Sequence, residues 1–259
     1  REITKIKNLQ RNIRSCQKLQ SLVLKFPQCY HYPSNTFHEF ERYSHKLKRL
    51  VIQPASGFQE SNSSLEHLKN LEALSLTIFS RFCLRFTKNI INALPIIPRL
   101  QEIDLDFKEF QNFDIYPFVL NKLACKTPAI KKLQLKFDLK DWVSQKVLRS
   151  LQDFHQLTSF TLSLKCNDLL PFISECIKNM TQLQYLKLSL VHSGTSLQST
   201  DNFQAICTEI SKLERLQHLK LSFNIPALHQ DKKITNPNFL LGLNHAFTKK
   251  IKTFSLVCD

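Results

Sequence analysis

The stretch from Leu157 to Leu190 reads LTSFTLSLKCNDLLPFISECIKNMTQLQYLKLSL and carries the same pattern at both of its ends. In LTSFTL and again in LQYLKL the last two apolar residues are separated by one polar residue, as they are in an extended strand with one buried face. Between these segments, apolar residues such as Phe172, Ile173 and Cys176 follow the spacing of a helix with one apolar side. The stretch therefore predicts a strand, a helix and a second strand.

The signature at the two ends of this stretch recurs along the whole chain. Nine segments match it: LQSLVL, LKRLVI, LEALSL, LQEIDL, IKKLQL, LTSFTL, LQYLKL, LQHLKL and IKTFSL, beginning at Leu19, Leu47, Leu71, Leu100, Ile130, Leu157, Leu183, Leu216 and Ile251. Successive starts lie 24 to 35 residues apart, a period typical of proteins that stack one structural unit on the next. Because parallel strands need a crossover connection, short strands that alternate with helices predict one parallel sheet.

These nine segments resemble the repeats of the leucine-rich repeat superfamily, and the resemblance extends from about Leu19 to the C-terminus. Their long period is similar to the ribonuclease-inhibitor or F-box-associated style, in which each unit is a strand plus a true helix. The repeats are degenerate, since the usual Asn or Cys after the strand is present at Asn224 but replaced at Phe79, Lys108 and Val191. The resemblance implies an α/β solenoid shaped as a horseshoe or arc, with the parallel sheet on the concave face and the helices on the convex face.

The chain is expected to divide into a short cap and a long solenoid. Residues 1–18 place Lys and Arg among apolar residues at helical spacing, which predicts a basic helical cap over the first strand. Read functionally, the same segment could lie on RNA or on an anionic membrane. Residues 19–259 are predicted to form the solenoid of about nine units, with an irregular region at about 27–70 where Pro27, Pro33, Pro54 and Gly57 favour loops.

Two features predict where helices start. Asn167 and Asp201 occupy positions that suit N-caps, because a short polar side chain can accept a hydrogen bond from the first turn. Pro171 and Pro237 are expected in first turns, where a missing N–H group is harmless.

The residues between the buried strand positions are predicted to project from the concave surface of the sheet. The fourth unit contributes an acidic set, and a basic strip with one Tyr and one His lies beside it. The candidate partner-binding residues are Glu102, Asp104, Asp106, Lys132, Gln134, Lys136, Tyr185, Lys187, His218 and Lys220. With strands ~4.8 Å apart, this surface would extend over roughly 40 Å, which is enough for a protein interface.

The overall charge favours an acidic partner. The 259 residues include 36 Lys and Arg against 21 Asp and Glu, a formal charge of +15. Three interpretations of the basic strip remain open: a solvated surface that keeps the sheet soluble, a site for an acidic protein, and a site for nucleic acid that combines lysines with stackable rings. No RRM or KH signature supports the third.

The residue pattern argues against enzyme chemistry, a metal centre or a bound cofactor. Three glycines far apart exclude a Walker or dinucleotide-binding loop, and the GxSxG motif is absent. His31, His38 and His45 are too far apart on a helix to share one zinc ion, whose ligands all lie within ~2.3 Å of it. We predict no catalytic, metal or cofactor-binding residues, and we assign Trp142 to the core.

Eight scattered cysteines without a CxxC pair predict reduced, mostly buried thiols, and with them an intracellular, cytoplasmic or nuclear protein that is not secreted. The sequence has no apolar run long enough to cross a bilayer. We therefore predict a non-enzymatic protein-interaction module, a scaffold or subunit of a larger intracellular assembly. One alternative is an RNA-binding subunit of a ribonucleoprotein, and another is the substrate-recognition arm of a ubiquitin ligase, by analogy.

Overall fold

The structure is a computed structural model of the whole chain, and it describes residues 18–25, 46–53, 65, 67–79, 84–108, 115–126, 129–137, 145–165, 169–191, 199–224 and 251–258. The described strands are β1 Ser21–Lys25, β2 Arg49–Gln53, β3 Ala73–Phe79, β4 Glu102–Lys108, β5 Lys132–Phe137, β6 Ser159–Lys165, β7 Tyr185–Val191, β8 His218–Asn224 and β9 Thr253–Cys258. They form one sheet in the order β1 to β9, and every neighbouring pair is parallel. The predicted α/β solenoid with a single parallel sheet is confirmed.

Each strand begins two residues after the first apolar residue of its repeat signature, for example β6 at Ser159 after Leu157. The same main-chain junction precedes each of the strands from β2 to β9. Two successive amides donate to one carbonyl of the previous unit, as the amides of Gln184 and Tyr185 do to the Thr158 carbonyl at 2.8 and 3.0 Å. This repeated junction holds consecutive strands in the same register, so equivalent residues of successive units lie side by side.

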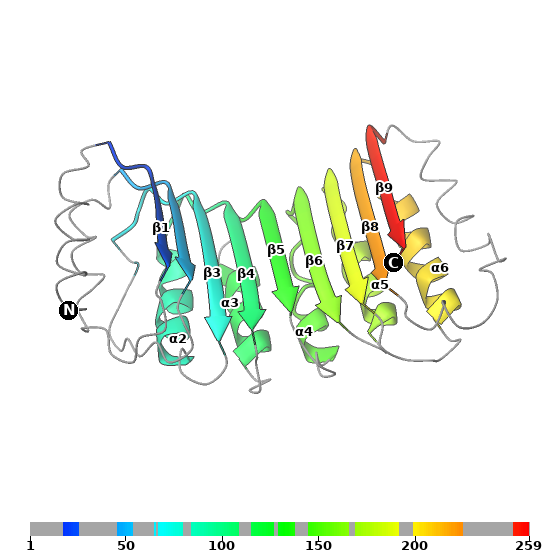
Figure 1. Cartoon of the computed structure of the whole chain (residues 1–259), viewed down its shortest axis with the longest axis horizontal. Helices are drawn as coiled ribbons and strands as arrows, with labels where there is room; N and C mark the ends of the chain where they lie inside the picture. Colours follow the sequence, from blue (N-terminus) through cyan, green and yellow to red (C-terminus); the bar gives the residue numbers. More distant parts are fainter. Residues whose placement is uncertain are drawn as a thin grey trace.

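The described helices all lie on one side of the sheet, behind the strands in the view of Figure 1, and the strands follow one another in a curved row. These helices are α2 Leu84–Ala93, α3 Ile115–Lys126, α4 Gln145–Arg149, α5 Leu170–Asn179 and α6 Ser199–Ser211, and a short 3-10 helix, η2, spans Leu94–Ile96. We call the opposite side, which the sequence predicts to be concave, the open face.

The core lies between the sheet and the helices. The inward residues of the central strands, such as Phe160, Leu186 and Leu219, are fully buried there. Apolar residues three apart then lead from the end of a helix to the next strand. After α5, the Met180 amide donates to the Ile177 carbonyl at 3.0 Å, and the Leu183 amide donates to the Met180 carbonyl at 3.1 Å. These tight turns bury one side chain per turn, so the connection belongs to the core as much as the helix does.

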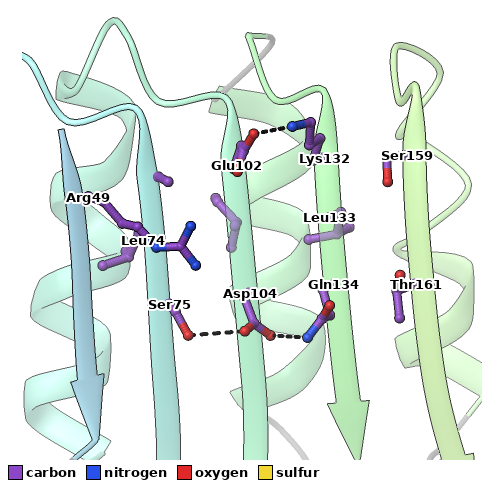
Figure 2. Close-up of a pocket in the computed structure, with 12 residues that line it drawn as sticks. Arg49, Leu74, Ser75, Glu102, Asp104, Lys132, Leu133, Gln134, Ser159 and Thr161 are labelled. Carbon is purple, nitrogen blue, oxygen red and sulfur yellow. Dashed lines mark hydrogen bonds and ion pairs between the residues drawn. The ribbon is translucent and has the colours of Figure 1, made fainter. Parts of the chain in front are cut away.

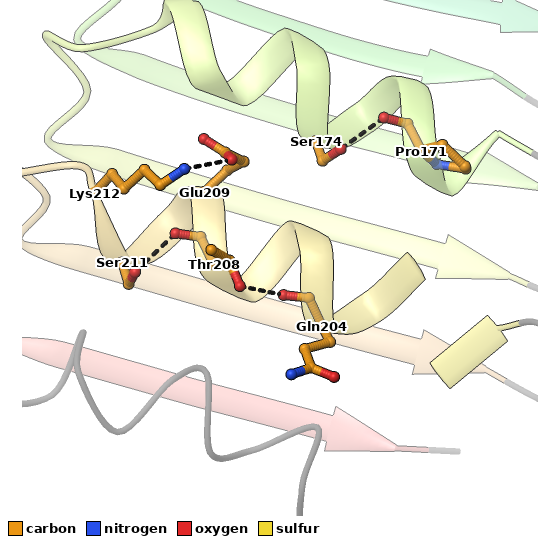
Figure 3. A network of polar contacts seen from close by, with 7 residues as sticks. All are labelled: Pro171, Ser174, Gln204, Thr208, Glu209, Ser211 and Lys212. Atoms are coloured by element: carbon orange, nitrogen blue, oxygen red, sulfur yellow. Dashed lines mark hydrogen bonds and ion pairs between the residues drawn. The ribbon is translucent and has the colours of Figure 1, made fainter. Parts of the chain in front are cut away.

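The predicted helix starts are partly wrong. The N-cap position of α5 is Leu169 rather than Asn167, and Leu169 makes no side-chain capping bond. Pro171 stands in the first turn as predicted. Asp201 lies inside α6 instead of preceding it. In the later turns of α5 and α6, hydroxyl groups donate to carbonyls of the preceding turn: Ser174 to Pro171 at 2.6 Å, Thr208 to Gln204 at 2.8 Å and Ser211 to Thr208 at 2.7 Å (Figure 3).

Two cysteines of the helices are buried and unbridged, as predicted. The Cys176 thiol donates to the Leu148 carbonyl at 2.9 Å, which ties α5 to α4. Burial, and after it the nearby charge of Glu175, raises the pKa of Cys176 to about 12. Burial alone raises the pKa of Cys207 to about 11. Both groups are therefore neutral core residues at physiological pH.

Several predictions fall outside the described residues. These are the basic cap apart from Lys18, most of the irregular region 27–70, the His31, His38 and His45 set, Trp142 and Pro237. Within the irregular region, the predicted unit at Leu47 does form β2. Among the described residues, no helix has the length and apolar character needed to span a membrane.

Candidate functional site

Side chains of the open face form rows that cross the sheet, because the register pairs equivalent positions of successive strands. The first row passes through Ser21, Arg49, Ala73, Glu102, Lys132, Ser159, Tyr185, His218 and Thr253. The second passes through Val23, Val51, Ser75, Asp104, Gln134, Thr161, Lys187, Lys220 and Ser255. All candidate binding residues lie in these two rows or in the next one, which contains Asp106 and Lys136.

The acidic set on β4 is satisfied by its neighbours. Glu102 forms an ion pair with Lys132 on β5, with side chains 39% and 57% exposed. Asp104 accepts hydrogen bonds from the Ser75 hydroxyl at 3.1 Å and the Gln134 amide at 2.9 Å, so it joins β3 to β5 (Figure 2). These contacts leave Glu102 and Asp104 with little demand for an external cation.

Asp106 completes the acidic set through a partner on its own strand. Its Oδ1 atom lies 3.4 Å from Lys108 Nζ, and its side chain is 24% exposed. This oxygen makes no hydrogen bond within the described part of the chain, so the ion pair is its compensating contact there. Lys108 was not among the candidate binding residues, although it could have been found because residues two apart on a strand share a face.

A shallow hollow of about 180 Å³ lies on the open face across β2 to β6. Ala73, the smallest residue of the first row, lines it between Arg49 and Glu102, and we call it the hollow above Ala73. Figure 2 shows the Arg49 side chain reaching over β3 into this space. Arg49 was not predicted as a site residue, and the signal for it was the small side chain of Ala73 beside it in the row.

The other charged region of the open face lies on β7 and β8. Lys187 and Lys220 are both exposed and stand directly opposite each other in the register. In the first row beside them, the rings of Tyr185 and His218 lie 6.4 Å apart, tilted by 39°. His218 Nδ1 is 2.8 Å from the Thr253 hydroxyl, which fixes the ring towards β9. We call Tyr185, Lys187, His218 and Lys220 the lysine surface.

Among the described residues, no carboxylate neutralises the lysine surface. Neither Lys187 nor Lys220 forms an ion pair with a carboxylate in the described parts of the chain. The paired outward positions on β6 to β9 hold Ser, Thr, Tyr, His, Lys, Asn and Val, with no Asp or Glu. Like charges on neighbouring strands repel each other, so this pair destabilises the free sheet slightly. An anion from outside the described chain would remove that repulsion.

The contacts of β4 also bear on metal binding. Within the described ranges, no group of three His, Cys, Asp or Glu side chains converges on a point that could hold a metal ion. The acidic set is instead spread along β4, with each carboxylate engaged by a different neighbour.

Comparisons with known proteins leave the chain without a family assignment. No protein-family model matches it, and no curated protein matches it. Among solved structures, it is similar to the crystal structure of human 5T4 (Wnt-activated inhibitory factor 1, trophoblast glycoprotein), with 16% sequence identity over 79% of this chain and 70% of that chain and a TM-score of 0.45. The assignment of the fold therefore rests on the order and register of the strands themselves.

Proposed function

We propose that the protein is an interaction module that binds an acidic segment of a partner protein on the open face, centred on the lysine surface. The observation that carries this proposal is the uncompensated pair Lys187 and Lys220, exposed on a sheet whose acidic residues are already engaged. An acidic segment would supply a negative charge that the described residues do not place beside the two lysines.

The shape of the open face supports a protein partner. No described helix covers this side of the sheet, and its side chains are mostly small and polar, so a partner can approach the strands closely. A row of nine strands spaced ~4.8 Å apart offers roughly 40 Å of surface, the scale of a standard interface. The hollow above Ala73 offers room for one side chain at the other end of the same surface.

RNA is the second candidate, and the ring pair of Tyr185 and His218 beside two lysines is the observation that favours it. A phosphate backbone that continued along the rows would pass Lys132 and Lys136 on β5 and then meet the carboxylates of β4, about three strand spacings or ~14 Å from β7. That acidic region would repel it. A protein segment can place acidic residues over the lysines and neutral ones over β4, so the charge pattern favours protein.

The proposal also includes an intracellular location and a role as a subunit or scaffold, both of which were expected from the sequence. Buried thiols without bridges at Cys176 and Cys207 support an intracellular location. A fixed subunit or scaffold of a larger assembly would suit a long, mostly polar open face. The substrate arm of a ubiquitin ligase and the ribonuclease-inhibitor subtype rest on the resemblance of the repeats alone.

The test is affinity capture from an extract with a matched pair of variants. Lys187→Glu with Lys220→Glu reverses the two charges of the lysine surface, and Lys131→Glu with Lys252→Glu makes the same change in net charge at exposed positions just before β5 and β9. We expect one acidic protein to bind the wild type and the control variant, to be lost from the first variant, and to survive ribonuclease treatment.

Equal capture by both variants would contradict the proposed site. Loss of the captured protein on ribonuclease treatment, together with a steep decline in binding as salt increases, would favour RNA instead. Circular dichroism of each variant must match the wild type, so that loss of binding reports on the surface and not on folding.

A further inference from the structure

We propose that Lys187 and Lys220 together bind a phosphomonoester, the side chain of a phosphorylated Ser, Thr or Tyr in the partner segment. This inference rests on the proposed function and names the group that occupies its centre. The starting point is the register, which places the two lysines on adjacent strands with no residue between them.

The charge of the two lysines favours a phosphomonoester. A phosphomonoester carries about −1.5 to −2 at pH 7, which matches two adjacent ammonium groups. A carboxylate or a phosphodiester carries about −1 and would leave one of the two lysines uncompensated. The outward positions of β6 and β9, on either side of the pair, contain no carboxylate that could supply the remainder. A dianion therefore neutralises this site completely, whereas a single carboxylate does not.

Hydroxyl groups near the two lysines supply further hydrogen-bond donors. Thr161 precedes Lys187 in the second row and Ser255 follows Lys220 in it, while Ser189 and Ser222 lie two residues farther along the same strands. None of these hydroxyls has a side-chain partner among the described residues, unlike Ser75, which donates to Asp104. Three terminal phosphoryl oxygens can accept from two ammonium groups and from surrounding hydroxyls at once, which a carboxylate with two oxygens can do less fully.

The hollow above Ala73 differs from the lysine surface in the balance of its charges. There Arg49 and Lys132 share the lining with Glu102 and Asp104, so the formal charges of the four side chains cancel. A dianion at that place would meet two carboxylates that are already hydrogen-bonded or paired. Of the two charged regions, the lysine surface is the one suited to a multiply charged anion.

The experiment compares three short peptides that differ at one residue. Acetyl-Gly-Ala-Xaa-Ala-Gly-amide, with Xaa as phosphoserine, glutamate or serine, is titrated into the full chain at pH 7.5 and fixed ionic strength, with binding followed by NMR. We expect the phosphoserine peptide to bind at least about tenfold more tightly than the glutamate peptide. Lys187→Gln and Lys220→Gln should each remove most of that advantage, while the control Lys131→Gln should retain it.

Two results would overturn the inference. One is equal affinity for the phosphoserine and glutamate peptides, which contradicts a phosphate site but leaves an acidic protein partner possible. The other is tighter binding of a five-residue uridine oligonucleotide than of the phosphoserine peptide, which would identify a phosphodiester as the ligand. The capture experiment with charge-reversed variants fails or succeeds independently, so the failure of the phosphate site and of the proposed function can be told apart.

Discussion

The acidic set on β4 and the lysine surface on β7 and β8 occupy equivalent positions of one repeated structure, but their charged groups differ in whether neighbouring strands supply partners for them. Glu102, Asp104 and Asp106 each find a partner on β3, β4 or β5. Lys187 and Lys220 stand opposite each other, and neither forms an ion pair with a carboxylate in the described ranges. Since the scaffold beneath both regions is the same, the difference lies in the outward residues, and of the two regions it leaves only the lysine surface without compensating carboxylates among the described residues.

The largest change in stability is expected from the buried leucines beneath the two regions. Leu105→Ala under the acidic set and Leu188→Ala under the lysine surface each remove a fully buried side chain. We expect each to lower the free energy of unfolding by about 2–5 kcal/mol, measured by urea denaturation. If only one were strongly destabilising, the two regions would not share equivalent scaffolding and the comparison would lose its basis.

A smaller effect is expected from removing the middle carboxylate of the acidic set. Asp104→Ala leaves the Ser75 hydroxyl and the Gln134 amide without their acceptor. The loss should lower the free energy of unfolding by about 1–2 kcal/mol. Asp104→Asn keeps the shape and one acceptor oxygen, and it should be less destabilising. An unchanged stability in Asp104→Ala would show that the acidic set does not depend on these contacts.

The opposite sign is expected on the lysine surface. Lys220→Glu replaces the repulsion from Lys187 with attraction, so the free protein should gain about 0.5 kcal/mol in stability. The gain should shrink in 1 M salt, and it should disappear when Lys187→Gln is added. A loss of stability in low salt would mean that Lys220 already has a compensating partner.

The smallest effect is expected from the exposed ion pair. Lys132→Gln removes the partner of Glu102, but both side chains are in contact with solvent, so the change should be about 0.3 kcal/mol. Urea denaturation of Lys132→Gln and Asp104→Ala side by side compares their free energies of unfolding. A destabilisation as large as that of Asp104→Ala would show that the acidic set is held together by the ion pair rather than by the hydrogen bonds.

Most of the fold was predictable from the sequence because alternation at a period of two identifies the buried face of each strand. The same rule placed Asp104 and Lys187 on the open face. The helix starts were less predictable: the first turn of α5 begins at Leu170 and includes Pro171, so Asn167 lies too early to cap it.

The contacts within the site depend on information that a single repeat does not carry. The ion pair between Glu102 and Lys132 and the bond from Ser75 to Asp104 join residues about one repeat apart, so they depend on the register between strands. The lining of the hollow combines residues of five strands, from Arg49 on β2 to Thr161 on β6, so it depends on the same register. An alignment of the repeat cores is enough to place Lys187 beside Lys220. The hydrogen bonds and ion pairs of the acidic set could be identified only from the positions of the side chains.

The most direct test of the proposed site is an NMR titration of isotope-labelled protein with an octaglutamate peptide. We expect amide shifts to concentrate on β7 and β8, from Tyr185 to Val191 and from His218 to Asn224, and we expect Lys187→Gln with Lys220→Gln to abolish them. Shifts that concentrate instead along β4, from Glu102 to Lys108, or that persist unchanged in the double variant, would contradict it.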